Sequence, residues 1–159
     1  MVNILGMIIA IDPGTVQSAC VEWDGTKIQQ ADIWPNGLLL ERLSGEMGFE
    51  PILYIEMVQS FAMPVGREVF ETILWIGRFY QEWTRSTLTE PKLVYRRDIK
   101  LHHCNSVKAK DSNIRQALID KYGPPGKKAN PGVTYGLKKD LWAAFAIATY
   151  ASERQLQKA

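Results

Sequence analysis

The sequence predicts an α/β domain built on a five-stranded mixed sheet, with three antiparallel strands followed by two parallel ones and helices on its faces. Residues 7–12 are rich in β-branched side chains, and residues 17–23 alternate between apolar and polar, which are patterns typical of strands. Asp24-Gly25, a strong hairpin signal, leads from the second strand to a third at 27–34. Because the rest of the chain alternates strands with helices, we expect parallel strands to extend this meander.

The elements after residue 34 follow from hydrophobic spacing and from turn residues. A helix over 112–122 would take Asp111 or Ser112 as its N-cap and end at Gly123. The chain has no linker, repeat or low-complexity tract, so we expect residues 1–159 to form one domain. The other expected elements are helices at 37–47, 65–83 and 138–155, strands at 52–56 and from 93–95, and loops at 57–65 and 124–136.

Composition sets broad limits on function. The chain carries a net charge of only +2, yet residues 92–128 hold ten basic residues against three acidic ones. A basic region on an otherwise acidic chain suggests an extended anion as partner, although a solvated lysine-rich surface would look the same. Two cysteines are too few for a disulfide framework, and no apolar run reaches the roughly 18 residues of a membrane span. We therefore expect a cytoplasmic protein with no membrane partner.

Three carboxylates stand where core residues are expected. Asp12 ends the first strand before a Pro13-Gly14 turn, Glu56 ends the strand at 52–56, and Asp140 opens the alanine-rich last helix. Each has an ordinary explanation: a turn former, a surface residue at a strand end, and an acid that favours a helix N-terminus. If the first and fourth strands are neighbours, however, the fold would bring all three together.

Clustered carboxylates repel one another, and a hard divalent cation relieves that repulsion. Mg²⁺ and Mn²⁺ prefer carboxylate and water ligands and often share a substrate phosphate. Two such ions can activate a water and stabilise the leaving oxygen of a phosphodiester. The sequence therefore predicts a Mg²⁺ site, with Mn²⁺ as a substitute, formed by Asp12, Glu56 and Asp140.

The segments around these acids carry a family resemblance. Ile9-Ala10-Ile11-Asp12-Pro13-Gly14-Thr15, then Tyr54-Ile55-Glu56-Met57-Val58, then Asp140 with its alanine-rich helix, resemble the RuvC family of Holliday-junction resolvases. The similarity is greatest to the phage-borne branch, within the ribonuclease H-like superfamily, and it covers about residues 7 to 152. It implies that Asp12, Glu56 and Asp140 are the metal-binding acids of an endonuclease. Such an enzyme hydrolyses DNA phosphodiesters with Mg²⁺ and leaves 5′-phosphate and 3′-hydroxyl ends.

The resemblance also implies partners. Resolvases of this family act as homodimers on four-way or other branched DNA, inside a bacterial cell or a phage-infected one. The helix at 65–83 would be the dimer element, with Ile73, Leu74, Gly77 and Phe79 on it, although an ordinary core-facing helix explains it equally well.

One departure from the family concerns a fourth acid. Relatives often carry a second Asp three or four residues along the last helix, where this chain has Ala143 and Ala144. Either three acids suffice or another residue contributes. Asp111 is a candidate, though a helix N-cap is its simpler explanation. One of His102 and His103 could serve, because adjacent residues on a strand face opposite ways, but surface placement is the simpler expectation for both.

Several further residues are candidates for DNA contact. Lys108 and Lys110 precede the helix at 112–122, whose N-terminal N–H groups favour phosphate. Arg96 and Arg97 would alternate on a strand, so that one faces DNA. Phe61 follows Glu56 in a loop and could stack on a base, as an aromatic does in the family, or pack into the core.

Other functions remain open at this point. The same acids could serve a nuclease for RNA or for replication forks. A non-catalytic DNA-binding protein could retain the fold, and the missing fourth acid favours that alternative. A sugar-kinase-type phosphate loop also opens with Asp-x-Gly-Thr, but that architecture needs a far longer chain.

Overall fold

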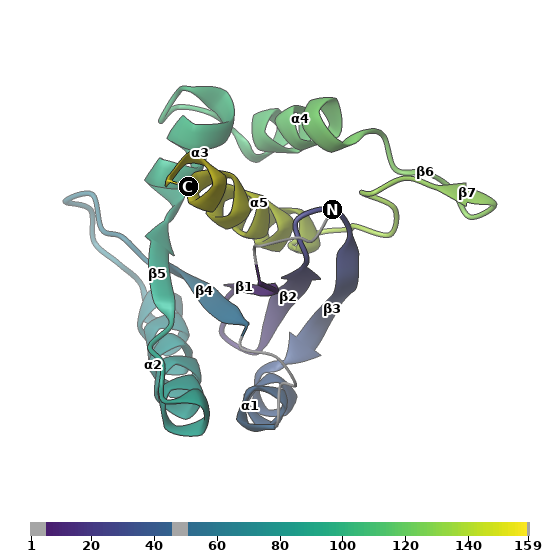
Figure 1. Cartoon of the computed structure of the whole chain (residues 1–159). Helices are drawn as coiled ribbons and strands as arrows, with labels where there is room; N and C mark the ends of the chain where they lie inside the picture. Colours follow the sequence, from purple (N-terminus) through teal and green to yellow (C-terminus); the bar gives the residue numbers. More distant parts are fainter. Residues whose placement is uncertain (1–5, 46–50, 159) are drawn as a thin grey trace.

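The computed structural model describes residues 6–45 and 51–158. Its centre is a five-stranded sheet with the order β3-β2-β1-β4-β5, in which β1 pairs antiparallel with β2, β2 antiparallel with β3, and β1–β4–β5 run parallel. This confirms the predicted fold class (Figure 1). The strands are β1 Ile8–Asp12, β2 Gln17–Trp23, β3 Ile28–Pro35, β4 Ile52–Met57 and β5 Lys92–Tyr95.

The register of the central strands determines where the acids lie. Ile11 of β1 is the partner of Ile55 on the parallel strand β4. Asp12 and Glu56 are the next residues on these strands, and they therefore lie side by side at the same edge of the sheet. The β-branched run in β1 is buried on both faces, as expected for a central strand.

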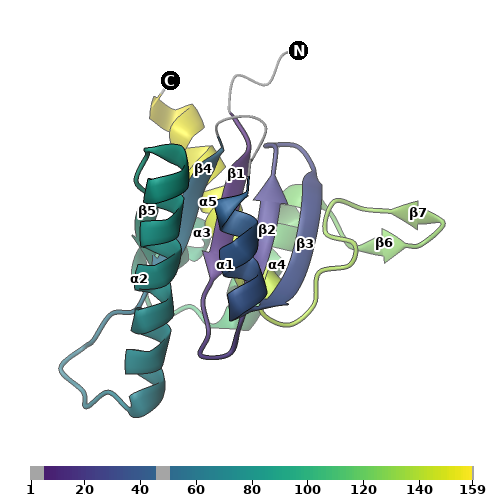
Figure 2. The same cartoon turned by 90° about the horizontal axis from the view of Figure 1, so that it is seen from below.

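Helices cover both faces of the sheet (Figures 1 and 2). On one face, α1 (Asn36–Ser44) and α2 (Arg67–Thr87) enclose a core that includes Ile9 and Phe79. On the other face, α5 (Leu141–Lys158) lies against β1 and β2 and shares a core with Ile8 and Trp23. Small side chains on α5, such as Ala144, are fully buried and allow this close approach. None of the described helices is long and apolar enough to cross a membrane.

The region after β5 differs from the sequence prediction. Residues Arg96–Cys104 form a helix, α3, so the expectation that Arg96, Arg97, His102 and His103 lie on a strand is wrong. Ile99 and His103, one turn apart, are the buried residues of α3, so the buried side of this helix is short of apolar residues. Its charges suit a helix nonetheless, with Asp98 in the first turn and the histidines in the last.

Smaller corrections concern element boundaries. Helix α4 (Asp111–Tyr122) has Lys110 as its N-cap, so neither Asp111 nor Ser112 takes that position. The backbone N–H of Lys110 instead donates to Asn113 Oδ1 at 2.9 Å. The predicted loop at 124–136 contains a short hairpin of β6 (Gly126–Lys127) and β7 (Asn130–Pro131). The end of the predicted helix 37–47 lies outside the described residues.

Candidate active site

The turn that follows Asp12 is held in place by a partly buried hydrogen-bond network. Gly14 N–H donates to Ser18 Oγ at 3.1 Å, Ser18 Oγ donates to Asn36 Oδ1 at 2.6 Å, and Asn36 Nδ2 donates to Gly14 O at 2.9 Å. A Cβ on Gly14 would come within 2.3 Å of the Gln17 carbonyl oxygen, so this position requires glycine. The network fixes the backbone that carries Asp12 at the sheet edge.

Asp12 and Glu56 form a close carboxylate pair. Burial raises the pKa of Asp12 to about 8, and the neighbouring Glu56 contributes to that rise through its charge and a shared hydrogen bond. The charge of Asp140 acts in the same direction, while the guanidinium of Arg96 opposes it. The three predicted acids therefore share one electrostatic environment, which disfavours the charged form of Asp12.

Asp140 is the third predicted acid, and its charge acts on Asp12. It lies in an exposed turn just before α5 and lines a small pocket of about 70 Å³ that also includes Asp111 and Ala143. Among the described residues, the one group of three potential ligands whose atoms all lie within 4.8 Å of one another is His102, His103 and Glu153, not these acids.

Arg96 lies between the carboxylates of Glu56 and Asp111. Its Nη1 is 3.5 Å from Glu56 Oε1, and its Nη2 forms an ion pair with Asp111. It lines both the Asp140 pocket and a larger one beside Glu56. Helix α3 thus aims Arg96 at the carboxylates, a placement that the sequence did not indicate. Asp111, a candidate for the fourth ligand, forms an ion pair with Arg96.

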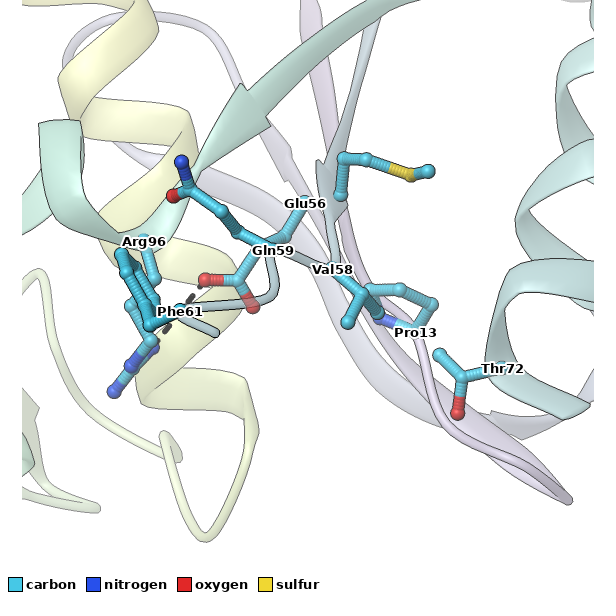
Figure 3. Close-up of a pocket in the computed structure, with 8 residues that line it drawn as sticks. Pro13, Glu56, Val58, Gln59, Phe61, Thr72 and Arg96 are labelled. Carbon is cyan, nitrogen blue, oxygen red and sulfur yellow. Dashed lines mark hydrogen bonds and ion pairs between the residues drawn. The ribbon is translucent and has the colours of Figure 1, made fainter. Parts of the chain in front are cut away.

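The larger pocket, of about 260 Å³, opens beside Glu56 (Figure 3). Phe61 lines it and is 64% exposed, so the alternative that Phe61 packs into the core is wrong. Thr72 on α2 closes the opposite side, as Figure 3 shows, and Pro13 and Val58 contribute apolar surface. An exposed aromatic ring beside a carboxylate and a guanidinium forms a surface on which a nucleotide base could stack.

The remaining basic candidates are exposed, but none of them lines either pocket. Arg97 lies in the first turn of α3, while Lys108 and Lys110 lie in the connection that leads into α4. Lys139 and Arg115, which line the Asp140 pocket, are candidates that the sequence did not indicate. The basic Lys138-Lys139 pair directly before Asp140 was the available signal for Lys139.

The two histidines do not contact the acids. His103 is only 7% exposed, so the expectation of surface placement is wrong for it. Desolvation on burial lowers the pKa of His103 to about 4, and the same cause lowers that of His102. His103 lies beside Lys121 and Ala146, and His102 beside Glu153, so neither supplies a fourth ligand next to Asp140.

The fold of this chain is similar to that of RuvC, as two solved structures show. The structure of Thermus thermophilus RuvC in complex with a Holliday junction substrate matches with a TM-score of 0.69 and 13% identity, covering 96% of this chain and 97% of that one. A second Thermus thermophilus RuvC structure matches with a TM-score of 0.68 and 11% identity, over 96% and 97% of the two chains. No protein-family model matches the sequence, and no curated protein does. The resemblance seen in the motifs is thus confirmed at the level of the fold.

Proposed function

We propose that this chain is a Mg²⁺-dependent endonuclease that cleaves branched DNA, with four-way junctions as its principal substrate. The observation that carries the proposal is the Asp12–Glu56 pair at the ends of adjacent parallel strands, with Asp140 and Arg96 beside it, in a RuvC fold. The neighbour solved with a Holliday junction supports the choice of substrate. The whole described chain would serve as one nuclease domain.

The donor set fits a hard divalent cation. Asp12, Glu56 and Asp140 offer only carboxylate oxygens, which Mg²⁺ and Mn²⁺ prefer. The raised pKa of Asp12, about 8, reflects burial and crowded negative charge, and a bound cation would relieve that charge. When bound, such ions activate a water and stabilise the leaving oxygen of a phosphodiester.

The chain's own groups would position the DNA. Arg96 is within reach of Glu56 and lines both pockets, so its guanidinium is placed to bind a phosphate that enters between them. Lys108, Lys110 and Arg97 are exposed, and we expect them to supply further phosphate contacts. Phe61 would stack on a base exposed at the branch point.

A homodimer would let two such sites cut opposite strands. Helix α2 buries Phe79 in the core but exposes Phe70, Ile73 and Leu74 on its outer side. A shallow groove of about 550 Å³ between α1 and α2 has an apolar side formed by Leu40, Ile73, Leu74 and Gly77 and a polar side formed by Arg78, Gln81 and Glu82. This apolar surface supports α2 as the dimer element, while Phe79 belongs to the core.

A panel of substrates tests the proposal. Four-way junctions, forks, linear duplex and RNA:DNA hybrid are incubated with the protein in Mg²⁺ or in EDTA. We expect cleavage of the four-way junction in Mg²⁺ alone, lost in Asp12→Asn. Preferred cleavage of forks or of the hybrid would replace the substrate assignment. Junction binding without cleavage would favour a non-catalytic role, which Ala143 in the Asp140 pocket also favours.

A further inference from the structure

Helices α3, α4 and α5 meet in two places. Their N-terminal ends surround the acidic site: Arg96 begins α3, Asp111 begins α4, and Asp140 precedes α5. Their later turns converge again on a polar cluster roughly 20 Å further along α5, given the rise of a helix. The cluster comprises His102 and His103 from α3, Lys121 and Tyr122 from α4, and Glu153 from α5.

The cluster has the dimensions of a metal site. One ligand atom from each of His102, His103 and Glu153 lies within 4.8 Å of the others. His102 Nε2 is 3.5 Å from Glu153 Oε1. Two ligands of one tetrahedral zinc ion are separated by about 3.3 Å, given metal–ligand bonds of about 2.0–2.1 Å. The side chains therefore need only small movements to bind one ion.

The groups around the cluster orient the ligand atoms. His103 Nε2 lies 2.9 Å from the carbonyl oxygen of Ala146, a contact in which the ring nitrogen donates. That contact leaves His103 Nδ1 free of a proton and facing the cluster, the arrangement that is common behind metal-bound histidines. Tyr122 Oη donates to Glu153 Oε2 at 3.0 Å and so directs Oε1 inward.

His102 supplies the second sign of a ligand. Its side chain is only 10% exposed, and its buried Nε2, at 3.5 Å from Glu153 Oε1, lacks a well-formed hydrogen bond within the described residues. A buried polar atom without a partner is costly. A metal ion bound to this nitrogen would remove that cost.

A cation already lies between these atoms. Lys121 Nζ is 3.1 Å from His103 Nδ1 and 2.9 Å from Glu153 Oε1. We propose that His102, His103 and Glu153 form a Zn²⁺ site, in which the Lys121 ammonium takes the place of the ion when no metal is bound. The Lys121 side chain is 35% exposed, so it can swing into solvent as Zn²⁺ enters.

The donor set selects the kind of metal. Two imidazole nitrogens and one carboxylate oxygen suit Zn²⁺ and poorly suit Mg²⁺, which prefers oxygen ligands. Three protein ligands leave a fourth position for water. The ligands come from α3 and α5, so a bound ion would link these two helices. At their N-terminal ends, α3 begins with Arg96 and α5 begins just after Asp140. The inference does not depend on the proposed nuclease activity.

The test is a Zn²⁺ titration in competition with a chromophoric chelator. The parent is the full-length Asp12→Asn/Asp140→Asn chain, treated with EDTA and desalted, so that the acidic site does not contribute. We expect one equivalent of Zn²⁺ to bind, and Co²⁺ to give the strong visible absorption of a tetrahedral site. His102→Gln and Glu153→Gln should each weaken binding by at least about tenfold.

Two lysine variants complete the design. Lys121→Met removes the competing cation and should tighten Zn²⁺ binding by about tenfold or more, whereas Lys100→Met, elsewhere on α3, should leave it unchanged. Circular dichroism checks that each variant folds. The inference is overturned if neither the parent nor Lys121→Met binds Zn²⁺. It is equally overturned if folded His102→Gln and Glu153→Gln bind the ion as tightly as the parent.

Discussion

Replacing Asp12 with asparagine should make the protein more stable at neutral pH while abolishing cleavage. In the folded chain without metal, burial and the Glu56 carboxylate raise the pKa of Asp12 from 3.8 to about 8. Because folding raises the pKa of this carboxyl, its contribution to the free energy of unfolding is fully present below pH 3.8, where it is protonated in both states. That contribution is lost as the pH rises towards 8. The asparagine side chain would keep a hydrogen bond to Glu56 without the charge.

The size of the effect follows from the pKa difference. Each pKa unit corresponds to about 1.4 kcal/mol, so the ionisation of Asp12 costs at most ~4 kcal/mol at pH 7. Asp12 is partly exposed, and solvent screens its charge, so we expect roughly 2–3 kcal/mol. Such a gain is typical of sites where function is kept at the expense of stability.

Urea unfolding in EDTA at pH 4, 6 and 8 measures the effect. The stability advantage of Asp12→Asn over the wild type should be small at pH 4 and grow steadily to pH 8. Asp32→Asn, an exposed change on β3, serves as the control and should show no such growth. If Asp12→Asn is no more stable than the wild type at pH 8, Asp12 is not a buried carboxylate crowded by negative charge.

Further predictions address DNA binding, assembly and the core. Lys108→Ala and Lys110→Ala should each reduce the slope of log affinity against log salt by about one, because each removes one phosphate contact; an unchanged slope in a filter-binding assay would exclude that contact. Leu74→Glu should convert a dimer to a monomer in sedimentation experiments, since Leu74 is 55% exposed on the apolar side of α2, and a variant that stays dimeric would place the interface elsewhere. Burial raises the pKa of the Cys20 thiol from 9.0 to about 12, so the stability it lends below pH 9 should be lost as pH rises to 12. Cys20→Ala should therefore show a shallower alkaline loss of stability in denaturant titrations than the wild type, and equal slopes would contradict the burial of the thiol.

The sequence revealed the sheet because its strands carry strong local signals. The buried run in β1, the alternation in β2 and the Asp24-Gly25 turn each agree with the final pairing. Asp12 and Glu56 were predictable as neighbours because acids at the ends of adjacent parallel strands have little freedom of position. Asp140 was less predictable, since its place depends on the turn before α5 rather than on a strand.

Helix α3 and its contacts were beyond sequence reasoning. A nine-residue helix whose buried side includes a single aliphatic residue, Ile99, gives little hydrophobic signal, and the strand expected from residue 93 was extended through its first residues. The position of Arg96 between Glu56 and Asp111 depends on how α3 packs against α4 and α5, which is a tertiary property. The burial of His103 likewise depends on neighbours that lie 18 and 43 residues away in the sequence.

The most direct test of the central claim is to map the cuts made in a four-way DNA junction in Mg²⁺, by the wild type and by Asp12→Asn side by side. The account predicts paired cuts on two opposing strands by the wild type, no cuts by Asp12→Asn, and junction binding by both proteins. Tight binding of the junction with no Mg²⁺-dependent cut by the wild type, or equal cutting by Asp12→Asn, would contradict it.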